Sequence, residues 1–239
     1  MSTIIYAAYQ GFQLGMFTIT ISSGLDYSLS MDNTISLMKK NPELYVEGLQ
    51  ANYINLLVIS PLYYIFVYLF LLDHSKTNSL YVIDYLSLLI IHNIGYYGFH
   101  KAMHHLPQLK HIHHFHHLFT DTVPTTGNAV SILEFNIAYV LPFIAGIMLL
   151  HPNNETLKAA IMTISSLNTF IHTPHFKDIQ LPDFIVSPMK HMNHHKTFAD
   201  TYAAPLLNID YFMEKFKGME MAQVVMNTND IDTECEKED

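Results

Sequence analysis

The sequence predicts an all-α integral membrane protein with about four transmembrane helices and a helical, histidine-rich cap at the cytosolic face of the membrane. Three observations lead to this prediction. Only 14% of the 239 residues are charged, whereas ordinary soluble domains carry charge on about a quarter of their residues. Several stretches lack charge over a length that can cross a bilayer as a helix. The 16 histidines concentrate directly after such stretches.

The clearest predicted span covers residues 48–72, which contain no charged residue. Pro61 lies within it, and a membrane helix tolerates proline because neighbouring groups take up the freed carbonyl. Residues 80–99 form a second predicted span, although this segment includes Asp84 and His92. The alternative is a soluble protein that buries these helices in its core, but a charge-free run of this length favours the membrane.

Two further spans and a candidate fifth membrane element complete the predicted bundle. Residues 135–150 and 159–171 form a second pair, and residues 3–22 are intermediate in polarity between a span and an interfacial helix. Each helix pair leads into a histidine-rich segment, so both segments are expected at one face of the membrane. All 12 lysines except Lys76 and Lys158 would lie on that face, which makes it cytosolic by the positive-inside tendency.

Charge and cysteine content exclude several classes of function. The net charge is −9 and the chain has no basic stripe that could neutralise phosphates, which excludes a nucleic-acid partner. The single cysteine, Cys235, rules out a disulfide or a cysteine-based zinc site within one chain. Any metal chemistry therefore depends on histidine, with carboxylates as helpers.

The histidines form a repeated motif, H-x-x-H-H. It occurs at His113, His116 and His117 and again at His191, His194 and His195. Residues at i, i+3 and i+4 lie on one face of a helix, so each triplet is expected to present three imidazoles toward one point. His100 and His104 are spaced i, i+4 and can share one metal. About 0.07 copies of the motif are expected by chance in this composition, so two copies indicate a function.

The motif imidazoles are too many for one ion. A structural zinc takes four ligands and a catalytic zinc about three, so eight imidazoles favour two adjacent metals. Imidazole prefers Zn, Cu, Fe or Ni to Mg or Ca, and spacing does not choose among the first four. His92 lies within a predicted span and is a functional candidate for that reason. The histidines not expected to bind metal are His74, His105, His111, His114 and His151.

The order of these motifs resembles the membrane-bound fatty acid hydroxylase and sterol desaturase superfamily. The segments that carry the resemblance, between about residues 84 and 210, are IIHNIGYYGFHKAMH, HHFHH, FIHTPHFKDIQLPDFIVSP and HMNHH. The resemblance implies that the metal ligands are His100, His104, His113, His116, His117, His172, His191, His194 and His195, with His175 as a further candidate. The chain departs from the family pattern at Asn93, where aspartate is frequent, and at Thr201, where asparagine is frequent.

The resemblance also implies a function, that of a di-iron monooxygenase that uses O2 to hydroxylate or desaturate a membrane lipid such as a sterol or a fatty acyl chain. No catalytic residue is expected beyond the metal centre. No flavin, haem or nicotinamide motif is apparent, so electrons are expected from a partner, by resemblance a membrane-bound b-type cytochrome or its reductase. The expected location in a eukaryotic cell is the endoplasmic reticulum membrane, with the metal site facing the cytosol. The acidic candidates for partners of the imidazole N–H groups are Asp121, Glu134, Asp200 and Asp210.

Three regions are predicted along the chain. They are an N-terminal membrane-associated segment (1–47), a membrane-embedded hydroxylase-like catalytic domain (48–213) and an acidic tail expected to be disordered (214–239). The sequence leaves two other functions open. A non-enzymatic membrane carrier of metal ions would place its ligands near the bilayer midplane. A zinc-dependent membrane hydrolase would combine a smaller ligand set with a carboxylate base.

Overall fold

The computed structural model describes residues 2–77, 79–199 and 201–218. Over these residues the protein is helical and has no strand, which confirms the all-α prediction. The α-helices are α1 (Thr3–Leu29), α2 (Met31–Lys40), α3 (Pro42–Ile54), α4 (Ser60–Phe70), α5 (Val82–His105), α6 (Lys110–His117), α7 (Ile132–Glu134), α8 (Leu141–Leu150), α9 (Asn154–Ile171) and α10 (Pro188–Thr197). A further helix covers residues 209–218. The acidic tail expected to be disordered begins at residue 214, but residues 214–218 belong to this helix. The rest of the tail, residues 219–239, lies outside the described residues.

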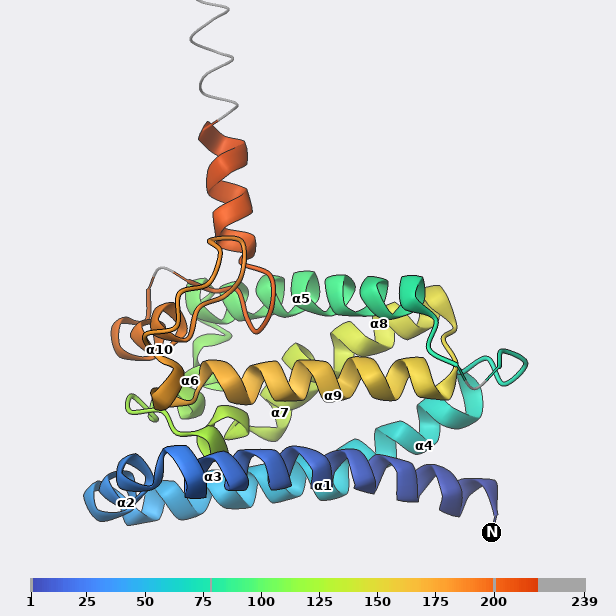
Figure 1. The fold of residues 1–239 in the computed structure, drawn as a ribbon, viewed down its shortest axis with the longest axis horizontal. Coiled ribbons are helices and arrows are strands. Elements are labelled where there is room, and N and C mark those ends of the chain that lie inside the picture. The colour runs from blue at the N-terminus through green and yellow to red at the C-terminus, as the bar shows by residue number, and fades with distance from the viewer. Residues whose placement is uncertain (1, 78, 200, 219–239) are drawn as a thin grey trace, which may run out of the picture.

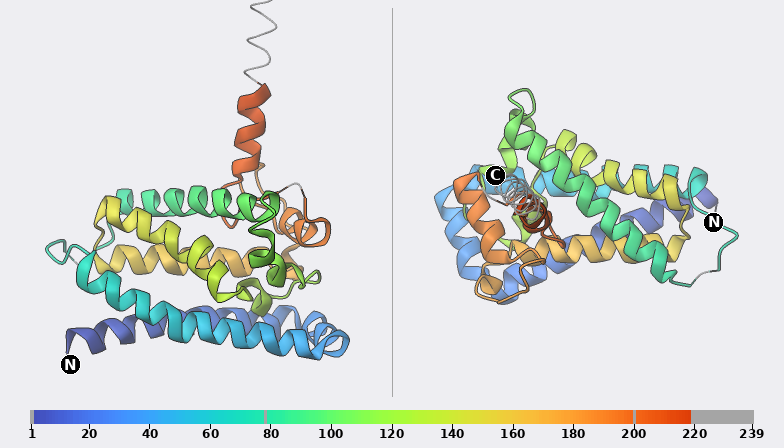
Figure 2. Two further views of the ribbon diagram at one scale, coloured as in Figure 1. Left: turned by 180° about the vertical axis from the view of Figure 1, so that it is seen from behind. Right: turned by 90° about the horizontal axis from the view of Figure 1, so that it is seen from above.

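The long helices lie side by side with roughly parallel axes (Figure 1). α1 packs along α4, α9 contacts both α1 and α5, and α5 packs against α8. α5 and α9 finish at the same end of the bundle, where α2, α6 and α10 also lie (Figures 1 and 2). The two histidine-rich segments therefore meet at one end of the bundle.

Polar caps determine where several of these helices begin. The Asn41 side chain accepts a hydrogen bond from the backbone of α3, Asn153 does the same for α9, and Ser187 for α10. Ser131 caps the short helix α7 by accepting from the Glu134 N–H at 3.1 Å. Such caps satisfy backbone donors that a helix start leaves free. The Ser131 cap also fixes the position of Glu134, whose side chain contacts His113.

Two helical stretches are long and apolar enough to cross a membrane, namely Pro42–Phe70 and Ile132–Leu150. They contain most of the predicted span 48–72 and all of the predicted span 135–150. The predicted spans 80–99 and 159–171 are helical as parts of α5 and α9, and residues 3–22 are helical within α1. A membrane-crossing role for these three helices stays a prediction.

The outer face of α5 is apolar. Ile83, Leu86, Ile90 and Ile94 are exposed and follow one stripe of the helix, and Ile83 is 80% exposed. Water-soluble proteins rarely expose contiguous apolar surface of this kind without a partner. This stripe supports contact of α5 with lipid.

Two π-turns accommodate prolines within the long helices. η1 (Asn55–Ile59) directly precedes Ser60 and Pro61, and η3 (Phe135–Val140) directly precedes Leu141 and Pro142. A proline inside a helix removes one hydrogen bond, and its ring collides with the carbonyl four residues earlier. The wider π-turn relieves this collision, and such turns are frequent at functional sites.

Glycines allow the neighbouring helices to approach these prolines. A Cβ atom added to Gly11 of α1 would lie 2.8 Å from the Cα of Pro61, and one added to Gly95 of α5 would lie 2.8 Å from the Cβ of Pro142. Small residues at helix contacts are the usual means of close packing in membrane proteins. The α1–α4 and α5–α8 contacts both depend on them.

Replacing Gly15 with alanine is expected to lower the melting temperature of the protein. The added Cβ would collide with the Leu56 carbonyl oxygen of η1, and overpacking of this kind costs about 1–3 kcal/mol. Gly24 on the same helix is the matched control, because nothing lies within 4 Å of its Cβ position. Alanine at Gly24 should stabilise α1 by about 0.8–1 kcal/mol. Thermal unfolding of the two variants in detergent tests this, and equal melting temperatures would contradict the close contact between α1 and η1.

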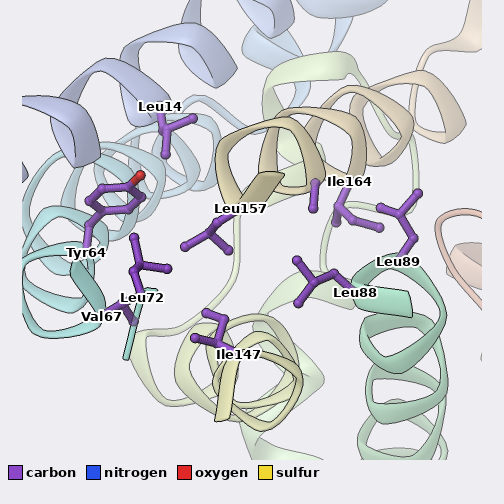
Figure 3. Close-up of a cluster of buried hydrophobic side chains, with 10 residues drawn as sticks. Leu14, Tyr64, Val67, Leu72, Leu88, Leu89, Ile147, Leu157 and Ile164 are labelled. Atoms are coloured by element: carbon purple, nitrogen blue, oxygen red, sulfur yellow. The ribbon is translucent and has the colours of Figure 1, made fainter. Parts of the chain in front are cut away.

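Buried apolar side chains from α1, α4, α5, α8 and α9 form a core inside the bundle (Figure 3). They include Leu14 of α1, Tyr64 and Val67 of α4, Leu88 of α5, Ile147 of α8, and Leu157 and Ile164 of α9. This core ties α5 and α9 together, so that their histidine-bearing ends are held at the same level.

Candidate metal centre

Nine of the ten histidines predicted as ligands come together at the end of the bundle, in two clusters. Within each cluster one ring nitrogen of every histidine lies within 4.8 Å of those of the others. The five-histidine cluster consists of His100, His104, His113, His117 and His194, and the four-histidine cluster consists of His116, His172, His191 and His195. His175 is exposed on the turn η4 (Pro174–Phe176) and belongs to neither.

Each H-x-x-H-H triplet is divided between the two clusters, which corrects the expectation that its three imidazoles meet at one point. His113 and His117 join the five-histidine cluster, whereas His116 joins the other. The helical repeat explains this, because each residue advances by about 100° around the axis. Residues i and i+4 therefore lie about 40° apart, while residue i+3 lies about 60° to the other side.

The second triplet divides in the same way. His191 and His195, spaced i and i+4, join the four-histidine cluster, and His194 joins the five-histidine cluster. α6 and α10 thus each face the boundary between the clusters and contribute to both. The ring centroids of His117 and His195 are only 5.0 Å apart, and those of His116 and His117 are 5.9 Å apart. The two clusters are direct neighbours.

Nitrogen–nitrogen distances in the five-histidine cluster match those of ligands on a shared ion. The Nε2 atom of His100 lies 3.2 Å from that of His104 and 3.2 Å from that of His194, and the Nε2 atoms of His104 and His117 are 3.1 Å apart. Two imidazole nitrogens that are each about 2.1 Å from one ion lie about 3.0 Å apart at a right angle and about 3.4 Å apart at a tetrahedral angle.

Hydrogen bonds at the far side of the rings show that these nitrogens present lone pairs to one another. The Nδ1 atom of His100 donates to the Tyr202 carbonyl at 2.7 Å, and that of His194 donates to the Ala199 carbonyl at 3.3 Å. A carbonyl oxygen can only accept, so the ring proton is on Nδ1 in both residues. Their Nε2 lone pairs then face each other at 3.2 Å. Such an arrangement is repulsive unless a cation lies between the two atoms.

The four-histidine cluster repeats this pattern. The Nδ1 atom of His172 donates to the Asn168 carbonyl at 2.7 Å, and its Nε2 atom lies 3.2 Å from that of His195 and 3.0 Å from that of His191. One lone pair cannot accept two hydrogen bonds of normal geometry. The Nε2 atom of His116 is buried without a hydrogen-bond partner among the described residues. Both clusters therefore fit a bound metal ion better than a network of hydrogen bonds.

Burial keeps these imidazoles neutral at physiological pH. It is the main cause that lowers the pKa of His104 and of His117 to about 3 and that of His172 to about 4. The charge that His194 would carry lowers the pKa of His104 and His117 further, while the hydrogen bond to Asn168 opposes the shift of His172. A neutral imidazole keeps its lone pair for a metal.

Glu134 holds one ligand in place. Its side chain is fully buried (0% exposed), and its Oε1 atom lies 2.5 Å from the Nδ1 atom of His113. The opposite nitrogen of His113 points into the five-histidine cluster and has no hydrogen-bond partner among the described residues. A carboxylate that accepts from the far nitrogen of a ligating histidine orients the ring and raises its basicity.

The other acidic candidates have different positions. Asp210 accepts from the backbone N–H groups of Tyr202 and Ala203, at 2.8 and 2.9 Å, and so holds the segment whose carbonyl binds His100. Asp121 is exposed and forms ion pairs with lysines rather than with a histidine. Asp200 lies outside the described residues.

Asn93 stands where the family pattern often has aspartate, and its side chain makes contacts that an aspartate could also make. The Asn93 side chain is buried, and its Oδ1 atom accepts from the backbone N–H groups of Leu206 and Leu207. An aspartate would offer the same acceptor oxygen. Asn93 thereby links α5 to the segment that leads toward Asp210.

Two residues near the four-histidine cluster escaped the sequence reasoning. Asn168 supplies the carbonyl that fixes His172, and its side chain donates to the Gly127 carbonyl at 2.9 Å. A Cβ atom added to Gly127 would lie 3.0 Å from the His172 ring, so a side chain there would require the ring to shift by a few tenths of an ångström. The position of Asn168, four residues before His172 on the same helix face, is the one local signal for the first contact. No local signal exists for the contact between Gly127 and His172, because the two residues are 45 positions apart in the sequence.

Comparison with curated proteins and with solved structures found no match. Comparison with protein families found a match to the family described as fatty acid hydroxylase over residues 85–215, which is more than half of the chain. The matched segment includes all nine clustered histidines and Glu134. With this match and these two histidine clusters, the chain belongs to the fatty acid hydroxylase family, within the superfamily that also includes the sterol desaturases.

Proposed function

We propose that the protein is a membrane-bound di-iron oxygenase that uses O2 to hydroxylate or desaturate a lipid, such as a sterol or a fatty acyl chain. The observation that carries this proposal is the pair of adjoining clusters in which imidazole lone pairs converge. Family membership supports lipid hydroxylation or desaturation. Imidazole donors suit Fe as they do Zn, Cu and Ni, and O2-dependent oxidation favours a redox-active metal over Zn.

The residues have separate tasks in this proposal. The five-histidine and four-histidine clusters would each hold one iron ion, and the bound metals would supply the activation of O2 that attack on an unactivated C–H bond requires. Glu134 keeps the His113 ring turned toward its cluster, and the Tyr202 and Asn168 carbonyls do the same for His100 and His172. Burial of these rings excludes water from the centre, which protects a reactive oxidant from side reactions.

The stoichiometry requires a further partner. Hydroxylation consumes one lipid, one O2, two electrons and two protons and yields the alcohol and one water, whereas desaturation yields the alkene and two waters. We propose that a membrane-bound b-type cytochrome or its reductase supplies the electrons. The bilayer would supply the lipid, and the cluster end of the bundle would face the cytosol, at the endoplasmic reticulum in a eukaryotic cell.

The two alternative functions find less support. A metal carrier would need ligands along a path through the bundle, but the clustered histidines lie at one end of it (Figure 1). A zinc hydrolase would need a free carboxylate beside its metal. Glu134 is a carboxylate beside a clustered histidine, but its Oε1 atom holds Nδ1 of His113, the ring nitrogen that faces away from the cluster.

Metal analysis and lipid profiling together test the proposal. Purified protein is expected to contain two metal ions per chain, and a host that expresses it with a suitable reductase should accumulate a lipid with an added oxygen or an added double bond. The comparison strain expresses the His194→Ala variant, which lacks one ligand of the five-histidine cluster. One ion per chain would contradict the dinuclear centre, and identical lipid profiles in the two strains would contradict the oxygenase.

A further inference from the structure

A cavity lies inside the helix bundle, next to the end that carries the metal centre. Apolar side chains from α1, α4, α8 and α9 line most of it, among them Leu14, Val67, Ile147 and Ile164. Figure 3 labels these four residues in the buried core to which the cavity is adjacent. The cavity has a volume of about 100 Å³. Ligand sites in helix bundles are usually apolar cavities of this kind with a few polar groups that fix orientation.

His92 of α5 is the first polar group of the wall. Its side chain is fully buried (0% exposed), and neither ring nitrogen has a hydrogen bond of normal geometry to a described residue. The backbone of Tyr139 lies close to the ring, but a carbonyl there could serve only the protonated nitrogen, because it can only accept. The other nitrogen carries a lone pair and lacks a donor. Buried polar atoms without partners are rare in native structures and require an explanation.

The Tyr139 hydroxyl is the second polar group. It lines the same cavity and lies between Tyr96 and Asn168, without a hydrogen bond of normal geometry to a described residue. His92 and Tyr139 share Tyr96 as a neighbour, since the ring centroid of Tyr96 is 6.4 Å from that of His92 and 5.3 Å from that of Tyr139. A lipid hydroxyl can donate to an imidazole lone pair and accept from a phenol through a single oxygen atom.

The polar end of the cavity lies directly behind the metal centre. The ring of Tyr96 is 5.2 Å from that of His100 in the five-histidine cluster. Asn168, another wall residue, provides the carbonyl that accepts from His172 in the four-histidine cluster. One layer of side chains therefore separates the cavity from both clusters.

We propose that this cavity binds the lipid substrate through a hydroxyl group, which donates a hydrogen bond to His92 and accepts one from Tyr139. The inference rests on the proposed function for the oxidation step and adds the substrate class, an alcohol whose apolar body would lie against the apolar side chains that line the cavity. The hydroxyl sets the depth of the lipid and thereby the carbon that lies nearest the metal centre. Sterols and long-chain alcohols share this chemistry.

Competition binding to the purified full-length protein in detergent tests the assignment. The probes are radiolabelled cholesterol and radiolabelled 1-octadecanol, and the competitors are the same alcohols and their matched hydrocarbons, cholestane and octadecane. One of the alcohols is expected to compete at about tenfold lower concentration than its hydrocarbon, and His92→Leu should weaken alcohol binding by about tenfold, as expected for about one lost hydrogen bond. Preference for cholesterol identifies a sterol substrate, and preference for octadecanol identifies a straight-chain alcohol.

Further variants separate recognition from structure. His92→Gln keeps one donor and one acceptor and should restore the preference for the alcohol, whereas Tyr139→Phe should reduce it. His74→Leu is the matched control, because His74 is exposed and does not line the cavity. Melting temperatures show whether each variant folds. A structural role alone would make His92→Leu lose affinity for alcohol and hydrocarbon equally.

The outcomes distinguish this inference from the proposed function. Wild-type protein that binds neither alcohol, or binds alcohol and hydrocarbon alike, overturns the assignment of the cavity even if a lipid is oxidised. Selective alcohol binding that depends on His92, in a protein that oxidises no lipid, supports the cavity assignment and overturns the oxygenase.

Discussion

Replacement of His172 with alanine is expected to remove the metal ion of the four-histidine cluster and to reduce lipid oxidation by about a thousandfold or more. Loss of a hydrogen-bond partner of a ligating histidine already lowers metal affinity or activity by about 10–100-fold. Removal of a direct ligand should lower both further. His172 is buried and its Nε2 atom is close to those of both His191 and His195. Metal content per chain should fall from two ions to one.

His175→Ala is the matched control for this prediction. His175 lies three residues farther along the same segment but is exposed and contacts Phe176 rather than a cluster histidine. The control should keep both ions and full activity. If His172→Ala kept two ions and wild-type activity, the four-histidine cluster would not be a metal site. If His175→Ala lost an ion, a rearrangement of η4 that brings His175 to the centre would have to be considered.

Replacement of Glu134 with leucine is expected to weaken metal binding in the five-histidine cluster by about 10–100-fold. The leucine leaves the Nδ1 atom of His113 buried without an acceptor, so the ring loses the contact that orients it. Glu134→Gln retains a carbonyl oxygen that can accept from the same N–H, so most of the affinity should return. Competition for iron with a chelator of known affinity measures both effects.

Asp121→Ala is the control variant, because it removes a carboxylate at the same end of the bundle as the metal centre. Asp121 is exposed and pairs with Lys40 and Lys196, and exposed ion pairs contribute only about 0–1 kcal/mol. Its removal should leave metal affinity unchanged. Equal affinities of Glu134→Leu and the wild type would show that the contact with His113 does not support the metal, and equal losses in Glu134→Leu and Glu134→Gln would point to the charge rather than the hydrogen bond.

The all-α fold could be predicted from the sequence because its signals are local. The helix Pro42–Phe70 contains most of the charge-free run at residues 48–72, and the helix Ile132–Leu150 contains all of the apolar segment at residues 135–150. Helix formation and hydrophobicity depend on neighbouring residues, so a short window of sequence contains them. A short window of sequence does not decide whether α1, α5 and α9 cross the membrane. Polar residues of these helices are buried inside the bundle, and only the tertiary structure shows that they are shielded from lipid.

The supporting contacts of the site depend on residues far apart in the chain. Tyr202 accepts from His100 across 102 positions, and Glu134 reaches His113 across 21. The H-x-x-H-H spacing identifies faces of α6 and α10 but does not say what each face meets. The packing of α5 and α9 at one end of the bundle decides this, and it places His175 outside both clusters.

The sequence by itself determined that the chain is helical, apolar over long stretches and rich in histidines at ligand spacing, since these properties follow from residue type and the helical repeat. Only the tertiary structure decided how the nine imidazoles divide into groups of five and four. The spacing places the histidines at i and i+4 on one side of α6 or α10 and the histidine at i+3 on the other side. Two clusters form only because the ends of α5 and α9 supply the remaining ligands, His100 and His104 for one cluster and His172 for the other. His92 shows the same division. Its position in a span marked it as a candidate, and the packing around it turned it toward the cavity and not toward the metal centre.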